Sequence, residues 1–186
     1  MTQYARPDSD ISVDSWVQWG YNYWKWSANG NSTSNLYAQI DEASASDSDY
    51  AKYKSMGSET GQIYYKAGLS DIDEPSDLST VSIRIRLQNS SVNCYVQLYD
   101  GTTEIKSFWT GTNASATDVD QSLTSTEAGN ISDWSDLRLW FSCDDDTQYQ
   151  TCYIYQAYLE AGDAAPAGTT VTPDAASFVT TASATV

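Results

Sequence analysis

The sequence predicts an all-β fold, an antiparallel β-sandwich of jelly-roll type with a short β-prone arm at its C-terminal end. Several short segments alternate apolar and polar residues with a period of two, as half-buried strands do. The aromatic residues are mainly 14 Tyr and 7 Trp, which favour strands. No stretch of ten or more residues keeps an amphipathic helical pattern. At 186 residues the chain is long enough for one sandwich of full size.

The clearest strand is Val81–Leu87, which places its apolar residues on one face and Arg84 and Arg86 on the other. Turn signals then separate two further predicted strands, Val92–Tyr99 and Thr103–Trp109. Because the three strands follow one another with short turns, they predict a β-meander.

A second pair of strands is predicted downstream. Leu137–Phe141 and Tyr153–Glu160 read as a hairpin across the polar loop Asp144–Thr151. Between the meander and this pair lies Asp118–Trp134. Its segment Leu123–Ala128 fits one helical turn, and a short strand with a loop is the open alternative.

The first third of the chain is less regular, with short β-prone segments between connections rich in Ser, Asn, Gly and Asp. The predicted strands here are Ile11–Val13, Ser15–Trp19, Leu36–Ile40 and Gln62–Ala67. The whole chain then holds about eight to ten strands, which favours a sandwich and leaves a barrel as the alternative.

Two regions are expected, a β-sandwich domain at 1–162 and a linker with a C-terminal docking arm at 163–186. The small residues of Ala161–Gly168 cannot build a core and are typical of a linker. Two short β-prone segments follow, Thr169–Thr172 and Ser177–Thr181. Because two short strands are not stable alone, we expect the arm to be ordered by docking on another surface.

Composition excludes several classes of function. With 25 acidic and 9 basic residues the formal net charge is −16, which repels a phosphate backbone, so no nucleic acid is expected as a partner. The absence of His removes Ser-His-Asp and Cys-His catalysis, and no phosphate-binding or dinucleotide motif occurs. We therefore predict that the protein is not an enzyme, with a two-carboxylate glycosidase as the remaining alternative. No apolar run suits a membrane span or a signal peptide, so neither membrane insertion nor export is expected.

No cofactor is predicted. The run Asp144–Asp146 could offer oxygen ligands to calcium, but it lacks the spacing of an EF-hand loop and is expected to be a solvated hairpin tip. The odd number of three cysteines argues against a disulfide framework. Cys94 and Cys143 fall in step with core positions, while a cross-strand disulfide between Cys143 and Cys152 stays an open alternative.

Aromatic residues are crowded into one short segment near the N-terminus. They are Trp16, Trp19, Tyr21, Tyr23, Trp24 and Trp26. Three interpretations stay open: these rings fill one end of the core, contact another protein, or form a platform that stacks against sugars. As candidate partner contacts we name Trp19, Tyr23, Trp24 and Trp26, together with Phe178 of the arm.

Segments spread over residues 6–160 carry a resemblance in their order and spacing. They are Arg6–Ser12 followed by Trp16, Leu36–Glu42 leading to Asp47–Tyr50, Tyr65–Asp71, Val81–Leu87, Val96–Gly101, Ile131–Leu139 and Tyr153–Glu160. In these segments the chain resembles a recurrent family of virion-associated proteins encoded by tailed phages. It departs from that family in the aromatic insert Tyr21–Trp26 and in its C-terminal arm.

The resemblance implies a jelly-roll sandwich on the virion surface, made in the host cytoplasm, and brings no catalytic residues with it. We expect a capsid decoration or cement protein that binds the major capsid protein or other virion proteins and forms a homo-oligomer on the particle. A carbohydrate-binding or host-adsorption module is the alternative function.

Overall fold

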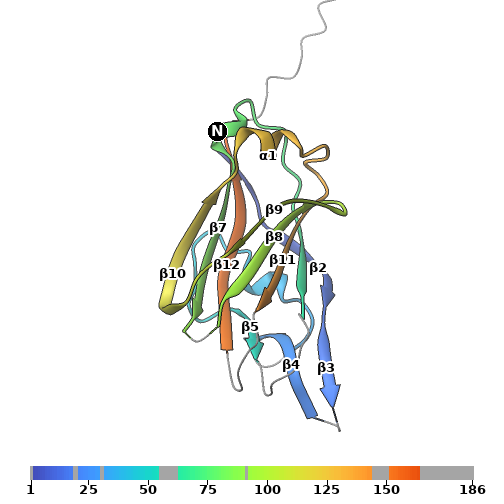
Figure 1. The fold of residues 1–186 in the computed structure, drawn as a ribbon, viewed down its shortest axis with the longest axis vertical. Coiled ribbons are helices and arrows are strands. Elements are labelled where there is room, and N and C mark those ends of the chain that lie inside the picture. The colour runs from blue at the N-terminus through green and yellow to red at the C-terminus, as the bar shows by residue number, and fades with distance from the viewer. Residues whose placement is uncertain are drawn as a thin grey trace, which may run out of the picture.

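The computed structural model describes residues 2–18, 21–29, 32–54, 63–90, 92–143 and 151–163, with the backbone alone at 15–18 and 21–25. This part of the chain forms two sheets, of seven and five strands, whose paired strands are all antiparallel. The sheets face each other across one hydrophobic core (Figure 1). The predicted antiparallel β-sandwich is therefore confirmed.

The seven-stranded sheet has the order β10-β7-β12-β5-β4-β3, and β1 also pairs with β12. Its strands are β1 (Gln3–Ala5), β3 (Ser15–Gln18), β4 (Tyr21–Ala28), β5 (Ala51–Lys54), β7 (Ser82–Asn89), β10 (Asn113–Ser122) and β12 (Thr151–Ala161). Strand β12 lies at the centre, because β7 occupies one of its edges while β5 and β1 share the other.

The five-stranded sheet has the order β2-β6-β11-β8-β9. Its strands are β2 (Pro7–Val13), β6 (Tyr65–Leu69), β8 (Cys94–Asp100), β9 (Thr103–Trp109) and β11 (Leu137–Cys143). Strand β11 is central and pairs with β6 on one side and β8 on the other.

Two sequence predictions about strand pairing are wrong. In the predicted meander, the pairing of β8 with β9 is confirmed, whereas β7 belongs to the other sheet. Likewise β11 and β12, predicted as a hairpin, lie in different sheets. In both places the inward faces of consecutive strands are apolar, and the structure buries these faces against each other across the core instead of placing the strands side by side.

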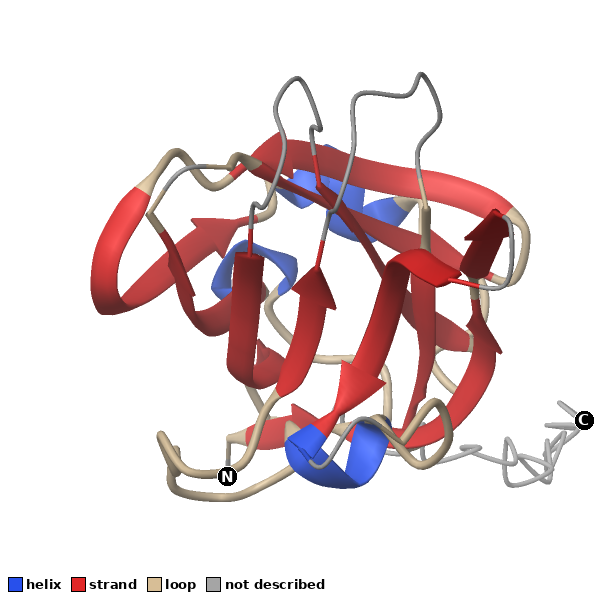
Figure 2. Cartoon of the chain, turned by 90° about the horizontal axis from the view of Figure 1, so that it is seen from below, coloured by secondary structure: helices blue, strands red, loops and turns tan. Residues whose placement is uncertain are grey.

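Helices are short and strands make up most of the described chain (Figure 2). Helix α1 (Ser125–Gly129) confirms the helical turn. Leu36–Ile40, predicted as a strand, contains the 3₁₀ helix Tyr37–Gln39 instead. Leu36 and Ile40 are fully buried while Ala38 between them is exposed, so the apolar spacing here is that of a helical turn. A second 3₁₀ helix spans Leu78–Thr80. No helix in the described residues is long and apolar enough to cross a membrane.

Trp26 joins the two sheets through the core. Its ring is fully buried and its centroid lies 5.5 Å from that of Tyr53 in its own sheet. On the opposite sheet it meets Tyr65 at 5.8 Å and Phe141 at 6.4 Å. Its indole N–H donates a hydrogen bond to the carbonyl of Ile63 at 3.1 Å, so the one polar group of the ring is satisfied.

Replacing Trp26 by Ala should lower the free energy of unfolding by about 3–5 kcal/mol, because it leaves a large cavity between the sheets. Urea titration followed by far-ultraviolet circular dichroism measures this change. The control Tyr4→Ala removes a ring that is 41% exposed and should cost less than about 1 kcal/mol. Equal losses in the two variants would contradict the role given to Trp26.

Glu127 should contribute charge-dependent stability at α1. Hydrogen bonds from the Thr124 backbone and from Lys106 lower the pKa of its carboxyl. A lowered folded-state pKa gives stability that is present above the unfolded pKa of about 4.3 and is lost as the pH falls through the folded value.

Glu127→Gln should therefore be less stable than the parent protein at pH 7 by up to about 1 kcal/mol, since this ion pair is partly exposed. The difference should shrink below about pH 4. Thermal unfolding at a series of pH values measures it. The exposed Glu74→Gln is a control for the loss of a surface carboxylate. A stability difference of Glu127→Gln that stays constant with pH would count against the ion pair.

Candidate functional site

The outer face of the five-stranded sheet carries an unusual set of side chains. In β8 the residues Cys94, Val96 and Leu98 are buried in the core, so strand alternation turns the residues between them outward. The outward residues of β8 are Tyr95, Gln97 and Tyr99. Two of the three are aromatic, a pattern opposite to the polar outer face that antiparallel sheets usually present to water.

The strands on either side of β8 continue this pattern. In β11, Leu139 and Phe141 are buried and Trp140 lies between them. Strand pairing places Trp140 opposite Gln97 of β8 and opposite Lys66 of β6. The outward residues therefore meet in rows that cross the sheet.

We define the aromatic face as Tyr64, Tyr95, Tyr99, Trp109 and Trp140, which come from β8, β9, β11 and the chain just before β6. Trp140 stands at its centre. Tyr99 stacks on the Trp140 ring with centroids 4.0 Å apart and an interplanar angle of 22°. The Lys66 ammonium lies 3.8 Å from the Trp140 centroid, a cation–π distance. Tyr64 meets Trp140 edge-on at 6.0 Å.

Trp109 forms the other part of the aromatic face. It lies opposite Tyr95 in the strand register, and the two ring centroids are 4.6 Å apart. Its side chain is 47% exposed, the largest value among the exposed large hydrophobic residues of the described chain. The Trp109 indole thus packs against a neighbouring ring while about half of the residue faces solvent.

Polar groups accompany the rings. The Gln97 amide donates to Glu104 Oε2 at 2.7 Å, and the Tyr99 hydroxyl donates to the same oxygen at 3.3 Å. Burial raises the pKa of Tyr99, and the negative charge of Glu104 raises it further. Arg138, on the outward side of β11 as well, is held by Asp136 at 2.9 Å. These contacts fix hydrogen-bonding groups beside the rings.

Three buried polar atoms of this sheet have no hydrogen-bond partner. They are Ser12 Oγ, Trp140 Nε1 and Ser142 Oγ. All three residues alternate with core positions and so belong to the outer side of the sheet. Unpaired buried polar atoms are uncommon and cost free energy. The sheet therefore holds hydrogen-bonding capacity that the described part of the protein does not use.

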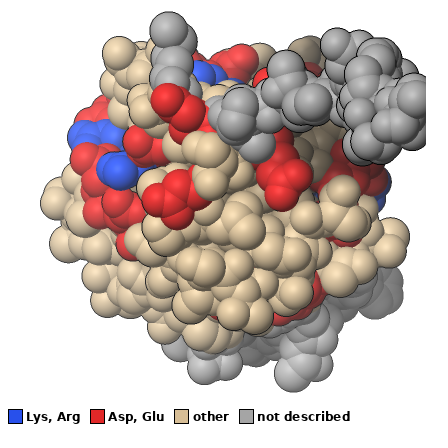
Figure 3. Space-filling model, turned by 90° about the horizontal axis from the view of Figure 1, so that it is seen from above, with Lys and Arg blue, Asp and Glu red and all other residues tan. Residues whose placement is uncertain are grey.

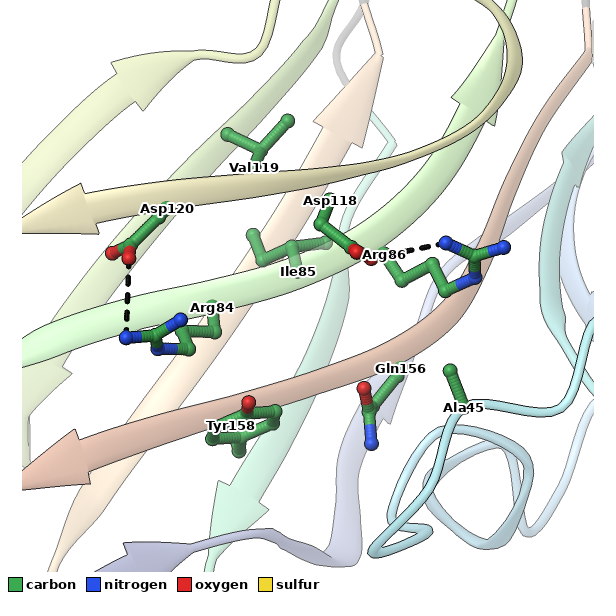
Figure 4. Close-up of a pocket in the computed structure, with 9 residues that line it drawn as sticks. All are labelled: Ala45, Arg84, Ile85, Arg86, Asp118, Val119, Asp120, Gln156 and Tyr158. Carbon is green, nitrogen blue, oxygen red and sulfur yellow. Dashed lines mark hydrogen bonds and ion pairs between the residues drawn. The ribbon is translucent and has the colours of Figure 1, made fainter.

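A hollow of about 200 Å³ on the seven-stranded sheet is a competing site (Figure 4). Its charged side chains neutralise one another. Arg84 pairs with Asp120 at 3.3 Å, and Arg86 pairs with Asp118 at 3.1 Å. Arg84 also contacts Glu160 and Arg86 also contacts Asp47, so this hollow is an ion-pair network with no unpaired charge to attract a ligand.

Acidic side chains are spread over the end of the sandwich that carries α1, with few basic ones among them (Figure 3). This distribution agrees with the formal charge of −16. It does not mark one site.

Of the residues that the sequence singled out as partner contacts, the structure places the side chain of Trp26 alone within the described part of the chain. Trp26 is fully buried in the core, so as a surface contact it is a wrong prediction, and the core interpretation applies to it because its ring is enclosed by both sheets. The backbones of Tyr23 and Trp24 lie in β4, and their side chains lie outside the described part of the structure. Trp19 and Phe178, and also Asp144–Asp146, lie outside the described residues.

Sequence reasoning missed the aromatic face. The pairing of β8 with β9, which joins Tyr95 to Trp109, follows from the predicted strands, but the pairing of β8 with β11, which adds Trp140, does not. One signal was present: Tyr95 and Tyr99 occupy the polar phase of a strand whose other phase is apolar.

Comparison with known proteins found no matching family model and no matching curated protein. Among solved structures, the chain is similar to the family 30 carbohydrate-binding module of a Clostridium thermocellum cellulosomal cellulase. The TM-score is 0.49 at 7% identity, covering 88% of this chain and 99% of that one. It is also similar to the xylan-binding module CBM86 from Roseburia intestinalis, with a TM-score of 0.44 and 10% identity over 87% of this chain and 94% of that one.

The chain also resembles part of the glycoside hydrolase domain of Endo-D from Streptococcus pneumoniae R6, with a TM-score of 0.46 and 7% identity. That match covers 81% of this chain and 21% of the other, so the chain spans about a fifth of that domain's length. With TM-scores below 0.5, what these proteins bind is not carried over to this chain.

The raised pKa of Tyr99 gives a test of the aromatic face. Its hydroxyl should ionise above the ordinary tyrosine pKa of about 10, because burial and the neighbouring carboxylate both disfavour the phenolate. Glu104→Gln should move that ionisation to lower pH. The measurement is alkaline absorbance titration of each protein minus its Tyr99→Phe counterpart. An unchanged difference curve in Glu104→Gln would contradict the contact.

Proposed function

We propose that the protein binds carbohydrate through the aromatic face of its five-stranded sheet and does so without cleaving it. The observation that carries this proposal is the set of aromatic rings on the outer side of a sheet, one of them 47% exposed, beside side chains able to hydrogen-bond. This is the alternative function considered from the sequence, placed at a different group of residues.

The rings of the aromatic face and the polar groups beside them match the two kinds of surface that a sugar presents. Pyranose rings expose C–H groups on their faces, and these pack with favourable dispersion contacts on flat aromatic rings such as Trp109. Sugar hydroxyls lie around the ring edge, where the amide of Gln97, the carboxylate of Glu104 and the hydroxyl of Tyr99 offer donors and acceptors. The aromatic face therefore offers both the flat apolar surface and the hydrogen-bonding groups that a sugar ring can use.

The sheet also holds these groups in place before a ligand arrives. Trp140 is fixed between Tyr99 and Lys66, and Trp109 is supported by Tyr95. Side chains that are already ordered lose little conformational entropy on binding. The site therefore requires no rearrangement of the backbone to receive an extended chain of sugar units.

The test is isothermal titration calorimetry of the purified protein against a panel of soluble plant, bacterial and algal polysaccharides. At least one should bind. Trp109→Ala should then weaken binding tenfold or more, equivalent to about 1.4 kcal/mol, because it removes the exposed platform. Tyr99→Ala should weaken it as well, because it removes one hydroxyl and the support of Trp140.

Tyr4→Ala is the matched control, since Tyr4 is 41% exposed but belongs to β1 of the other sheet. It should leave affinity unchanged. Unaltered urea midpoints would show that the variants remain folded. If no polysaccharide binds, or if Trp109→Ala binds as the parent protein does, carbohydrate binding at this face is refuted.

Capsid decoration, contact with the major capsid protein and homo-oligomerisation on a virion stay predictions. The arm at 163–186, to which docking was assigned, lies outside the described residues apart from Asp163. Binding of carbohydrate by the aromatic face would leave the surface of the seven-stranded sheet available for such a contact.

A further inference from the structure

Three cysteines that are distant in the sequence meet at one place in the core. Cys94 begins β8 and Cys143 ends β11, and the two lie opposite each other in the strand register. Cys152 comes from β12 in the other sheet. The three side chains therefore span the gap between the sheets.

Their geometry is that of a ligand set. The three Sγ atoms all lie within 4.8 Å of one another, and all three residues are almost completely buried. Each cysteine carries a free thiol, so the alternative of a Cys143–Cys152 disulfide is not what the structure shows. At this spacing, a single ion placed between the three sulfurs could contact all of them.

Within the described part of the chain, the cluster consists of cysteines alone. The chain has no His at all. Among the described residues, the cluster contains no carboxylate. Cys152 pairs with the buried Tyr53, and Cys143 follows the buried Phe141 by two positions on the same inward side. The neighbourhood is therefore apolar and sulfur-rich.

We propose that Cys94, Cys143 and Cys152 form a three-sulfur site for one soft, thiophilic cation with a filled d shell, of the type represented by Cu(I). Soft sulfur ligands select such ions over the hard ions magnesium and calcium, which require oxygen. Monovalent copper accepts three sulfurs in a plane, whereas structural zinc sites almost always have four ligands. The described residues supply three.

The position of the site gives it a structural effect. Because its ligands come from both sheets, a bound ion would link β8 and β11 to β12 across the core. Binding to the folded state alone stabilises that state by mass action. Ion binding at the three cysteines should therefore raise the unfolding temperature. Binding to surface carboxylates would not raise it when excess magnesium is present.

The experiment uses the whole chain, reduced and kept free of oxygen, and titrated with Cu(I) against a chromophoric chelator that competes for it. We expect one ion per chain, a sulfur-to-copper charge-transfer band in the near ultraviolet and a higher unfolding temperature. Cys94→Ser and Cys152→Ser should each weaken binding tenfold or more. Trp109 lies on the outer face of the sheet, so the Trp109→Ala variant should bind Cu(I) as the parent protein does.

A measurement on the unmodified protein keeps the proposal testable if these variants fail to fold. One equivalent of Cu(I) should protect all three thiols together from alkylation, as read by mass spectrometry. Protection of fewer thiols, binding unchanged in both serine variants, or no competition with the chelator would overturn the proposal. So would a thiol count of one in denaturant before reduction, because it would reveal a disulfide.

Discussion

The fold depends on the contact that Trp26 makes with both sheets at once. Its indole packs on Tyr53 of its own sheet and on Tyr65 and Phe141 of the other, with its N–H satisfied by a backbone carbonyl. Two sheets that share so large a buried ring are fixed in both spacing and relative position. On each neighbouring strand, the residues that point inward must then fill this core. The alternate residues, which point outward, are free to be of other types.

The aromatic face follows from that commitment. In β11, Phe141 belongs to the core while Trp140 beside it faces outward, so one strand supports both the interior and the candidate site. Packing that stabilises the sheet also holds the outer rings at set positions, which is what a rigid binding surface requires. This differs from sites built on loops, where affinity must offset the entropy of ordering the backbone.

Strands with regular alternation could be predicted from the sequence, and so could the β8–β9 hairpin with its short turn, but the partners of the other predicted strands could not. Thr103–Trp109 is observed with the predicted bounds, whereas β7 and β12 lie in a different sheet from their predicted neighbours. Alternation shows that a strand has one apolar side without showing which other strand will cover it. The same limit hid the aromatic face, since Trp140 joins Tyr99 only through the unpredicted pairing of β11 with β8. The spacing of Leu36 and Ile40 fits both a strand and a helical turn. The helical turn is favoured because the carboxylate of Asp10, distant in the chain, accepts hydrogen bonds from the backbone N–H groups at its start.

The pairing of β1 with β12 joins the first and the last strand of the described chain, with Gln3 opposite Ala161. During synthesis, the central strand of the larger sheet is thus made after β1, β5 and β7, and these three strands cannot pair with it before then. Such long-range pairing is slow to form and leaves strand edges open in the meantime. The many acidic residues of the chain should reduce aggregation during this time, because repulsion between like charges keeps incompletely folded copies apart until β12 has been made.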